Sequence, residues 1–152
     1  MCPDSRLPEL TVTLVVGREA FASDRMTAAG DAFHHLFRVR RLRRGDGIRL
    51  VNGAGSARRG RVAGVGRKSA EIELMEPLPS NEPALPVEIL TAMPRPQRAA
   101  WLVEKGTELG VVAIRFLHSE RGVTPPTRPG LERLRRVALA AVEQSHRSLV
   151  PE

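Results

Sequence analysis

The chain has 152 residues and a net charge of +7, with 41% hydrophobic and 27% charged residues. This composition is typical of a soluble globular protein with one domain or two small ones, and no apolar run approaches the roughly 18 residues of a membrane span. Cys2 is the only cysteine, which excludes an intrachain disulfide and a cysteine zinc site. The N-terminus lacks the basic start and apolar segment of a secretory signal, so we expect a cytoplasmic protein without a membrane partner.

The positive charge is concentrated in one block, residues 34–68. This block sets eleven Arg and Lys residues against a single acid, Asp46. Such a patch is the usual footprint of a protein that binds a polyanion, most often nucleic acid. The alternative is that the charge serves solubility alone.

Residues 10–76 contain short apolar or alternating runs separated by turn signals. Asn52-Gly53 is a strong hairpin signal, and Asp31–Val39 predicts a short helix with Phe33 and Leu36 on one face. Short strands with tight turns predict a small β-barrel. The predicted strands are Leu10–Val16, Ile48–Val51, Arg61–Val65 and Ala70–Met75.

The glycine-rich residues 53–60 follow a predicted strand but open no helix, so a nucleotide-binding loop is not indicated. We expect instead a hairpin with Arg58 and Arg59 at its tip, suited to a phosphate backbone. The adjacent His34 and His35 point to different sides of a helix and have no ligand partner at metal-binding spacing, so no metal site is predicted.

Four prolines between Glu76 and Pro86 indicate a linker, and we expect domains at residues 1–78 and 84–152. The second domain reads as alternating strands and helices, which predicts a parallel α/β sheet. Two parallel strands alone make a poor sheet, so we expect another segment to complete it. The predicted elements are Val87–Met93, Gln97–Leu109 closed by Gly110, Ala113–His118 and Leu131–Leu149.

Charged side chains line one face of each predicted helix of this domain. Each set is consistent either with a helix surface exposed to solvent or with an interface. Trp101 favours the interface for the first helix, because large aromatic side chains are enriched at interfaces. The two sets are Trp101, Glu104, Lys105 and Glu108, and Arg136, Glu143, Gln144 and Arg147.

Several motifs, in this order along the chain, resemble the RsmE-type 16S ribosomal RNA uridine N3-methyltransferases of the SPOUT class. The resemblance covers almost the whole chain from about residue 30 onward. The matching segments are His35–Asp46, Val51–Gly55, Val103–Val111, Ser119–Arg121, and Ala141–Arg147 continuing to Pro151.

The resemblance implies a small PUA-like β-barrel that holds RNA, followed by an α/β SPOUT domain with a trefoil knot. It also implies S-adenosylmethionine as cofactor, a homodimer, and methylation of a uridine in the 16S rRNA of the 30S subunit. Two departures from the family pattern stand out. Arg40 replaces a usual Leu, and residues 95–98 replace a lysine-glycine-acid-arginine turn.

By this resemblance, RNA-binding residues would be Arg38, Arg40, Arg41, Arg43, Arg44, Arg58 and Arg59. The substrate side of the active site or the dimer contact would be formed by Glu104, Lys105, Glu108, Glu120, Arg121, Glu143, Gln144 and Arg147, with no general base assigned. The family's glycine-rich cofactor loop and knot are expected beyond residue 152, so we expect a truncated, inactive form. The alternative is a non-catalytic RNA-binding module or a ribosome-associated factor.

Overall fold

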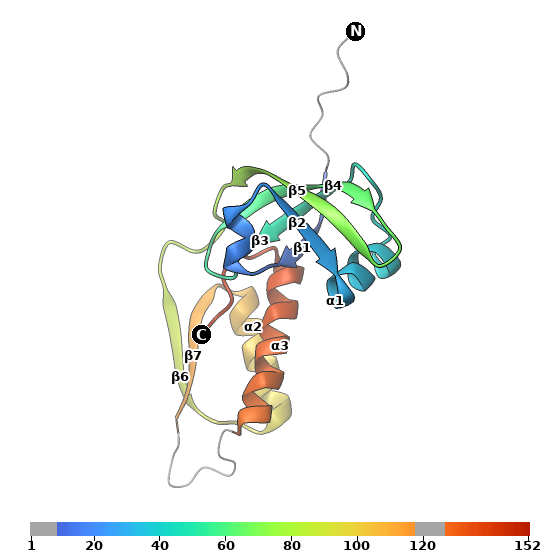
Figure 1. Ribbon diagram of the computed structural model, residues 1–152. Helices are drawn as coiled ribbons and strands as arrows, with labels where there is room; N and C mark the ends of the chain where they lie inside the picture. The colour runs from blue at the N-terminus through green and yellow to red at the C-terminus, as the bar shows by residue number, and fades with distance from the viewer. Residues whose placement is uncertain (1–8, 118–126) are drawn as a thin grey trace. The chain divides into compact units, whose positions relative to one another are not determined.

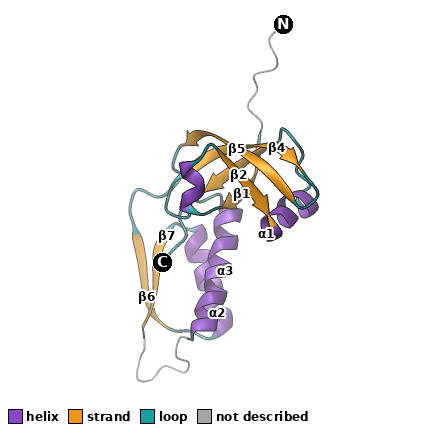
Figure 2. Cartoon of the chain, viewed as in Figure 1, coloured by secondary structure: helices purple, strands orange, loops and turns teal. Residues whose placement is uncertain are grey.

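The computed structural model describes residues 9–117 and 127–152 of the chain (Figure 1). The chain divides between Ser80 and Asn81 into two compact units. The first unit is built on a β-sheet, and the second combines strands with two long helices (Figure 2). Within the described chain, no helix has the length and apolar character that crossing a membrane requires.

The first unit is a five-stranded sheet in the order β1-β3-β4-β5-β2, in which β1 pairs parallel to β3 and the other pairs are antiparallel. A short 3-10 helix, η1, precedes β2, and a helical run, α1 followed by the π-helical η2, precedes β3. The bounds are β1 Leu10–Val15, η1 Arg18–Ala22, β2 Arg25–Ala29, α1 Gly30–Phe33, η2 His34–Val39, β3 Gly47–Val51, β4 Ala57–Val65 and β5 Ser69–Leu78.

Alternation along the strands builds the core of this unit. In β5 the side chains of Ala70, Ile72 and Leu74 are buried at every second position. They pack with Ile48 of β3 and with Leu36 of η2, which is fully buried. Each large aliphatic side chain buried in this way contributes about 1.5–3 kcal/mol to stability. The helical run is therefore fixed to the sheet by its apolar side.

The structure confirms the predicted strands and helix of this unit and adds two elements, η1 and β2. The strand β2 has only five residues; it pairs with β5 and turns Met26 and Ala28 toward the core. The expectation that Arg58 and Arg59 lie at a hairpin tip is wrong, because β4 begins at Ala57 and both arginines lie in the strand. The hairpin loop precedes them, where the Asn52 side chain accepts hydrogen bonds from the amides of Ala54 and Ser56.

The second unit contains β6 (Val87–Ala92), α2 (Pro96–Glu108), β7 (Val111–Leu117) and α3 (Arg128–Ser145). As predicted, β6 and β7 are parallel. Side chains from both strands and both helices form one core, so α2 and α3 cover the same face of the strands. The core includes Ile89, Val103, Ile114, Leu134 and Ala138.

The chain returns to β7 after α3. The Glu152 amide donates to Val112 O at 3.1 Å, and the Ile114 amide donates to Glu152 O at 2.8 Å. Glu152 is thus bonded to the residues on either side of Ala113, and this is the hydrogen-bond pattern of parallel strands. Glu152 therefore lies beside β7 and is hydrogen-bonded to it as in a parallel pair.

One helix boundary predicted in this unit is wrong, and one predicted strand end is not tested. The last helix ends at Ser145, four residues before the predicted Leu149, because His146 adopts the left-handed conformation with φ 57°. Leu109, the last residue of the predicted helix Gln97–Leu109, follows the end of α2 and is 81% exposed. The predicted strand end at His118 lies outside the described residues.

Candidate nucleic-acid interface

The densest positive charge lies on residues 38–46, here named the arginine turn, which leads from η2 toward β3. Leu42 anchors its first half, since this side chain is buried and its amide donates to Leu36 O at 3.1 Å. The Arg40 amide donates to His35 O at 3.0 Å. The chain between these anchors passes through Arg41, which has φ 58°. This conformation is uncommon for residues other than glycine and persists only where neighbouring contacts impose it.

Hydrogen bonds to β4 hold the second half of the arginine turn. The Gly45 amide donates to Val62 O at 2.8 Å, and the Val62 amide donates to Asp46 O at 3.0 Å. The Asp46 carboxylate accepts from the Arg43 amide at 2.7 Å. The backbone of the turn is therefore fixed at both ends and closed across its middle.

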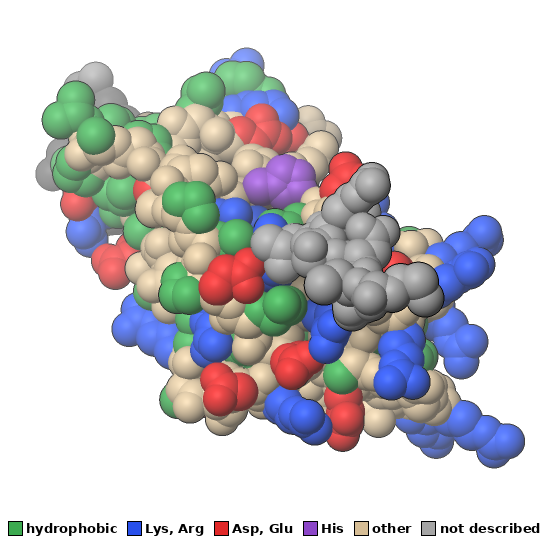
Figure 3. Space-filling model, turned by 90° about the horizontal axis from the view of Figure 1, so that it is seen from above, with side chains coloured by type: hydrophobic (Ala, Val, Ile, Leu, Met, Phe, Trp, Pro, Cys, Tyr) green, Lys and Arg blue, Asp and Glu red, His purple; other side chains and the backbone are tan. Residues whose placement is uncertain are grey.

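Five exposed arginines project from this fixed backbone, namely Arg38, Arg40, Arg41, Arg43 and Arg44. Within the part of the chain that the structure describes, none of their guanidinium groups has an ion-pair or hydrogen-bond partner. The Arg38 guanidinium lies 6.0 Å from the centroid of the Phe33 ring. Figure 3 shows Lys and Arg side chains projecting on the right, the side on which α1 lies in Figure 1.

Arg58 and Arg59, predicted to share this role, are instead bound by the protein. Arg58 donates to the carbonyls of Met75 at 2.9 Å and Phe21 at 3.3 Å and lies 3.5 Å from the Asp24 carboxylate. Arg59 pairs with Glu76 at 2.7 Å. The pKa of Glu76 is lowered, mainly by a hydrogen bond from the backbone and secondly by the hydrogen bond and charge of Arg59. The structure thus brings five of the seven predicted RNA-binding residues together and holds the other two in β4.

The charged residues of α2 form a local ion cluster. The Lys105 ammonium lies 2.8 Å from the Glu104 carboxylate and 2.9 Å from that of Glu108. The hydrogen bonds from Glu104 and Glu108 raise the pKa of Lys105. Trp101 on the same helix is 63% exposed. The two carboxylates are therefore occupied with Lys105, beside an exposed aromatic side chain.

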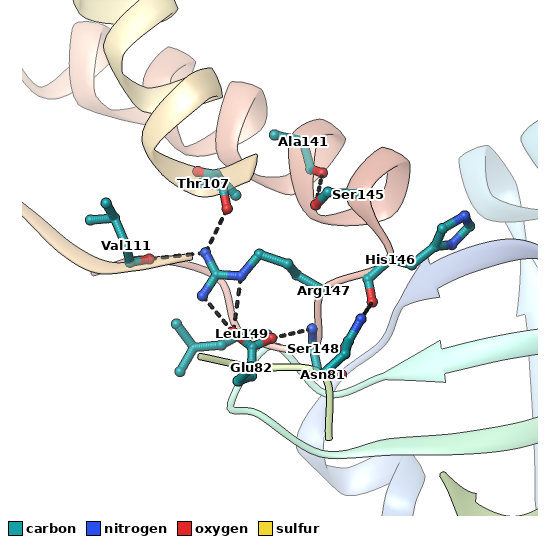
Figure 4. A network of polar contacts seen from close by, with 10 residues as sticks. All are labelled: Asn81, Glu82, Thr107, Val111, Ala141, Ser145, His146, Arg147, Ser148 and Leu149. Atoms are coloured by element: carbon teal, nitrogen blue, oxygen red, sulfur yellow. Dashed lines mark hydrogen bonds and ion pairs between the residues drawn. The ribbon is translucent and has the colours of Figure 1, made fainter. Parts of the chain in front are cut away.

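Arg147 is not on the polar face of a helix, and that prediction is wrong. The chain turns at His146, and the Arg147 side chain is only 4% exposed (Figure 4). Its guanidinium donates to Thr107 O at 2.7 Å and Val111 O at 2.9 Å, and pairs with Glu82 at 2.6 Å. It therefore satisfies carbonyls at the end of α2 and the start of β7.

Glu82 is a structural residue that the sequence analysis does not identify. Its second carboxylate oxygen accepts from the amides of Ser148 at 2.6 Å and Leu149 at 3.0 Å. Next to it, the Asn81 side chain donates to His146 O at 2.7 Å. The segment before β6 is thus fastened to the segment after α3. No local pattern signals this contact, because the partners are more than 60 residues apart in the chain.

Six of the eight residues predicted for the active site are described, and the structure brings three of them, Glu104, Lys105 and Glu108, into direct contact. The cluster of Glu104, Lys105 and Glu108 lies on α2, and Arg147 belongs to the buried network. Glu143 and Gln144 lie near the end of α3. Glu120 and Arg121 lie outside the described residues. Among the described residues, no group of three His, Cys, Asp or Glu side chains is arranged to hold a metal ion.

Comparison with known proteins relates both units to RNA modification. Residues 29–75 match a family model described as an RNA methyltransferase PUA domain, and residues 81–152 match an RNA methyltransferase domain. A Synechocystis ribosomal RNA small subunit methyltransferase E is 33% identical over 138 residues, which are 91% of this chain and 45% of that protein. This chain belongs to the RsmE-type family. It has a PUA-like sheet followed by an α/β unit of the SPOUT type.

Two further relatives support the RsmE-type assignment. The Bacillus subtilis protein of the same name is 28% identical over 80% of this chain and 50% of that protein. The Neisseria gonorrhoeae ribosomal RNA small subunit methyltransferase E, solved with S-adenosyl methionine bound, has a TM-score of 0.76 and 26% identity, over 92% of this chain and 60% of that one. This chain spans about half the length of the two ribosomal RNA relatives matched by sequence.

The described residues do not fit the cofactor of the RsmE-type family at the turn from β6 to α2. S-adenosylmethionine carries a positive sulfonium and an adenine that needs apolar surroundings. This turn exposes Arg95 and Arg98, whose charge would repel the sulfonium. Pro94 and Pro96 have no amide N–H to donate to the nucleoside.

Replacing Arg147 with Met should destabilise the α/β unit by about 3–5 kcal/mol, because the partly buried Glu82 carboxylate and two carbonyls lose their buried partner. Urea unfolding followed by the fluorescence of Trp101, which lies in the same unit, measures the loss. The matched control is Arg115→Met, since Arg115 forms an exposed ion pair with Glu88 at 3.0 Å and should affect unfolding little. Equal effects of the two substitutions would contradict the structural role of Arg147.

Proposed function

We propose that this protein acts in methylation of N3 of a uridine in 16S rRNA of the small ribosomal subunit, and that the arginine turn binds the RNA. The observation that carries the proposal is a set of five unpaired, exposed arginines on a fixed backbone, within a unit that matches an RNA methyltransferase PUA domain. The relatives named as ribosomal RNA small subunit methyltransferases support the substrate class.

The chemistry of the arginine turn suits a phosphate backbone. Guanidinium groups bind phosphate through two parallel N–H···O bonds, and each phosphate neutralised releases counterions. Among the described residues, no acceptor has to be released before Arg40, Arg41, Arg43 and Arg44 bind a ligand. Arg58 and Arg59 would have to break carbonyl or carboxylate contacts first, so we assign them to the barrel itself.

We propose S-adenosylmethionine as the methyl donor of the whole protein. Its sulfonium supplies the electrophilic methyl group, and the residues that bind it would belong to the part of the relatives that this chain does not span. The 152 residues alone are then inactive. We propose that seven of the predicted active-site residues border the substrate or a subunit contact, whereas Arg147 stabilises the fold. The seven are Glu104, Lys105, Glu108, Glu120, Arg121, Glu143 and Gln144.

The second part of this proposal is that the protein forms a cytoplasmic homodimer through a subunit contact. Trp101 at 63% and Leu109 at 81% exposure leave apolar surface on and just after α2, and Trp in particular is enriched among the residues that dominate interfaces. Sedimentation of the whole protein should show a dimer that Trp101→Gln weakens. A monomer at all concentrations would contradict this part of the proposal.

Replacing Arg43 and Arg44 with Gln should weaken binding to a 16S rRNA fragment at least about tenfold at moderate salt. The slope of log affinity against log salt should become shallower by about 1.4–1.8, the value for two lost phosphate contacts. Filter binding at several salt concentrations measures both quantities. The control pair is Arg61→Gln with Arg115→Gln, which removes the same charge from arginines already paired with Glu73 and Glu88. An equal loss in the control would contradict a specific role for the arginine turn.

Deleting the gene should remove N3-methyluridine from 16S rRNA in its own cells, and mass spectrometry of digested rRNA detects that loss. Restoring the natural gene should restore the modified nucleoside. If the modification persists without the gene, the methylation proposal fails. The alternative is an RNA-binding module without catalysis, which predicts this persistence together with retained RNA binding.

A further inference from the structure

We propose that Asp46, the one acid within the basic block 34–68, is a positioning residue for RNA binding. It holds the arginine turn in the shape that presents Arg40, Arg41, Arg43 and Arg44 together. The inference rests on the proposed RNA-binding function of this turn. It predicts that losing the side-chain acceptor of the Arg43 amide weakens the binding of RNA, even though the same substitution removes a negative charge from a phosphate-binding surface.

Asp46 connects three parts of the turn through separate atoms. Its carboxylate accepts from the Arg43 amide at 2.7 Å, and its own amide donates to Arg43 O at 3.1 Å. Its carbonyl accepts from the Val62 amide at 3.0 Å. The two backbone contacts attach the turn to itself and to β4, and only the carboxylate contact closes the turn at the Arg43 amide.

The Asp46 carboxylate is used for shape rather than for neutralising charge. Within the described chain it forms no ion pair, although four exposed arginines lie within six residues of it in the sequence. Its side chain instead accepts a hydrogen bond from a backbone amide. On simple Coulomb grounds, an unpaired carboxylate here opposes the approach of phosphate. A group that opposes the ligand by charge can still favour binding if it orders the groups that contact the ligand.

The backbone of the turn depends on such a closing contact. Arg41 has φ 58° and Gly45 has φ 95°, so two residues within five hold left-handed conformations. At Arg41 this conformation is strained, since the side chain approaches the following carbonyl. Without the carboxylate contact at Arg43, the segment between Leu42 and Gly45 can relax toward other conformations. Its arginines would then be ordered only at the expense of binding free energy.

Two substitutions separate shape from charge. Asp46→Asn and Asp46→Ala remove the same negative charge, but Asn retains a side-chain oxygen that can accept from the Arg43 amide. We expect Asp46→Ala to weaken binding of the 16S rRNA fragment about fivefold relative to the natural residue, the factor of one net hydrogen bond. Asp46→Asn should bind as tightly as the natural residue or more tightly. If both variants bind more tightly by the same factor, charge alone operates and the inference is overturned.

Hydrogen exchange of single amides supplies the structural readout. In Asp46→Ala the Arg43 amide should exchange faster, while the Gly45 and Val62 amides, which bond to backbone carbonyls, remain protected. Unchanged exchange at Arg43 overturns the inference. If Asp46→Ala fails to fold, Asp46→Leu takes its place, because Leu has a side chain of similar shape without a hydrogen-bond acceptor for the Arg43 amide.

The two proposals fail in different ways. If Arg43→Gln with Arg44→Gln leaves RNA binding unchanged, the proposed function of the arginine turn fails. If that pair loses binding but Asp46→Ala and Asp46→Asn behave alike, only the positioning role of Asp46 is wrong.

Discussion

The paired hydrogen bonds between Val62 of β4 and residues Gly45 and Asp46 are the constraint on which the account of this protein depends. Neighbouring arginines repel one another, and a free segment would spread them apart in solution. The barrel prevents this by fixing the backbone of the turn, with buried Leu42 as the second anchor. The sheet thus supplies the rigidity, and the turn supplies the charge that a polyanion would meet.

Arginine has two different uses in this chain, and its acceptors distinguish them. The arginines of the turn have no protein acceptor among the described residues, whereas Arg147 is buried among Glu82 and two carbonyls. A buried guanidinium without acceptors would be very unfavourable, and an exposed one already paired has less to offer a ligand. The sequence motif that contains Arg147 resembles a functional signature of the RsmE-type family, yet its arginine serves the fold.

Local patterns predicted most of the secondary structure. Alternation indicated β3 and β5, and Gly110 marked the end of α2, where it has φ 97°. The sequence missed β2, a strand of only five residues that pairs with β5, and it extended α3 past His146 because nothing local marks a left-handed His. The concentrated charge of residues 34–68 identified the arginine turn. Sequence alone could not separate Arg58 from Arg43, because the carbonyls that bind Arg58 come from distant segments.

The most direct test of the central claim is an NMR titration of the 152-residue chain with a 16S rRNA fragment. The account predicts that amide shifts move chiefly in residues 38–46, while residues 58–61 of β4 move little. Shifts concentrated in β4, or spread evenly over both units, would contradict the claim that the arginine turn is where this protein meets RNA.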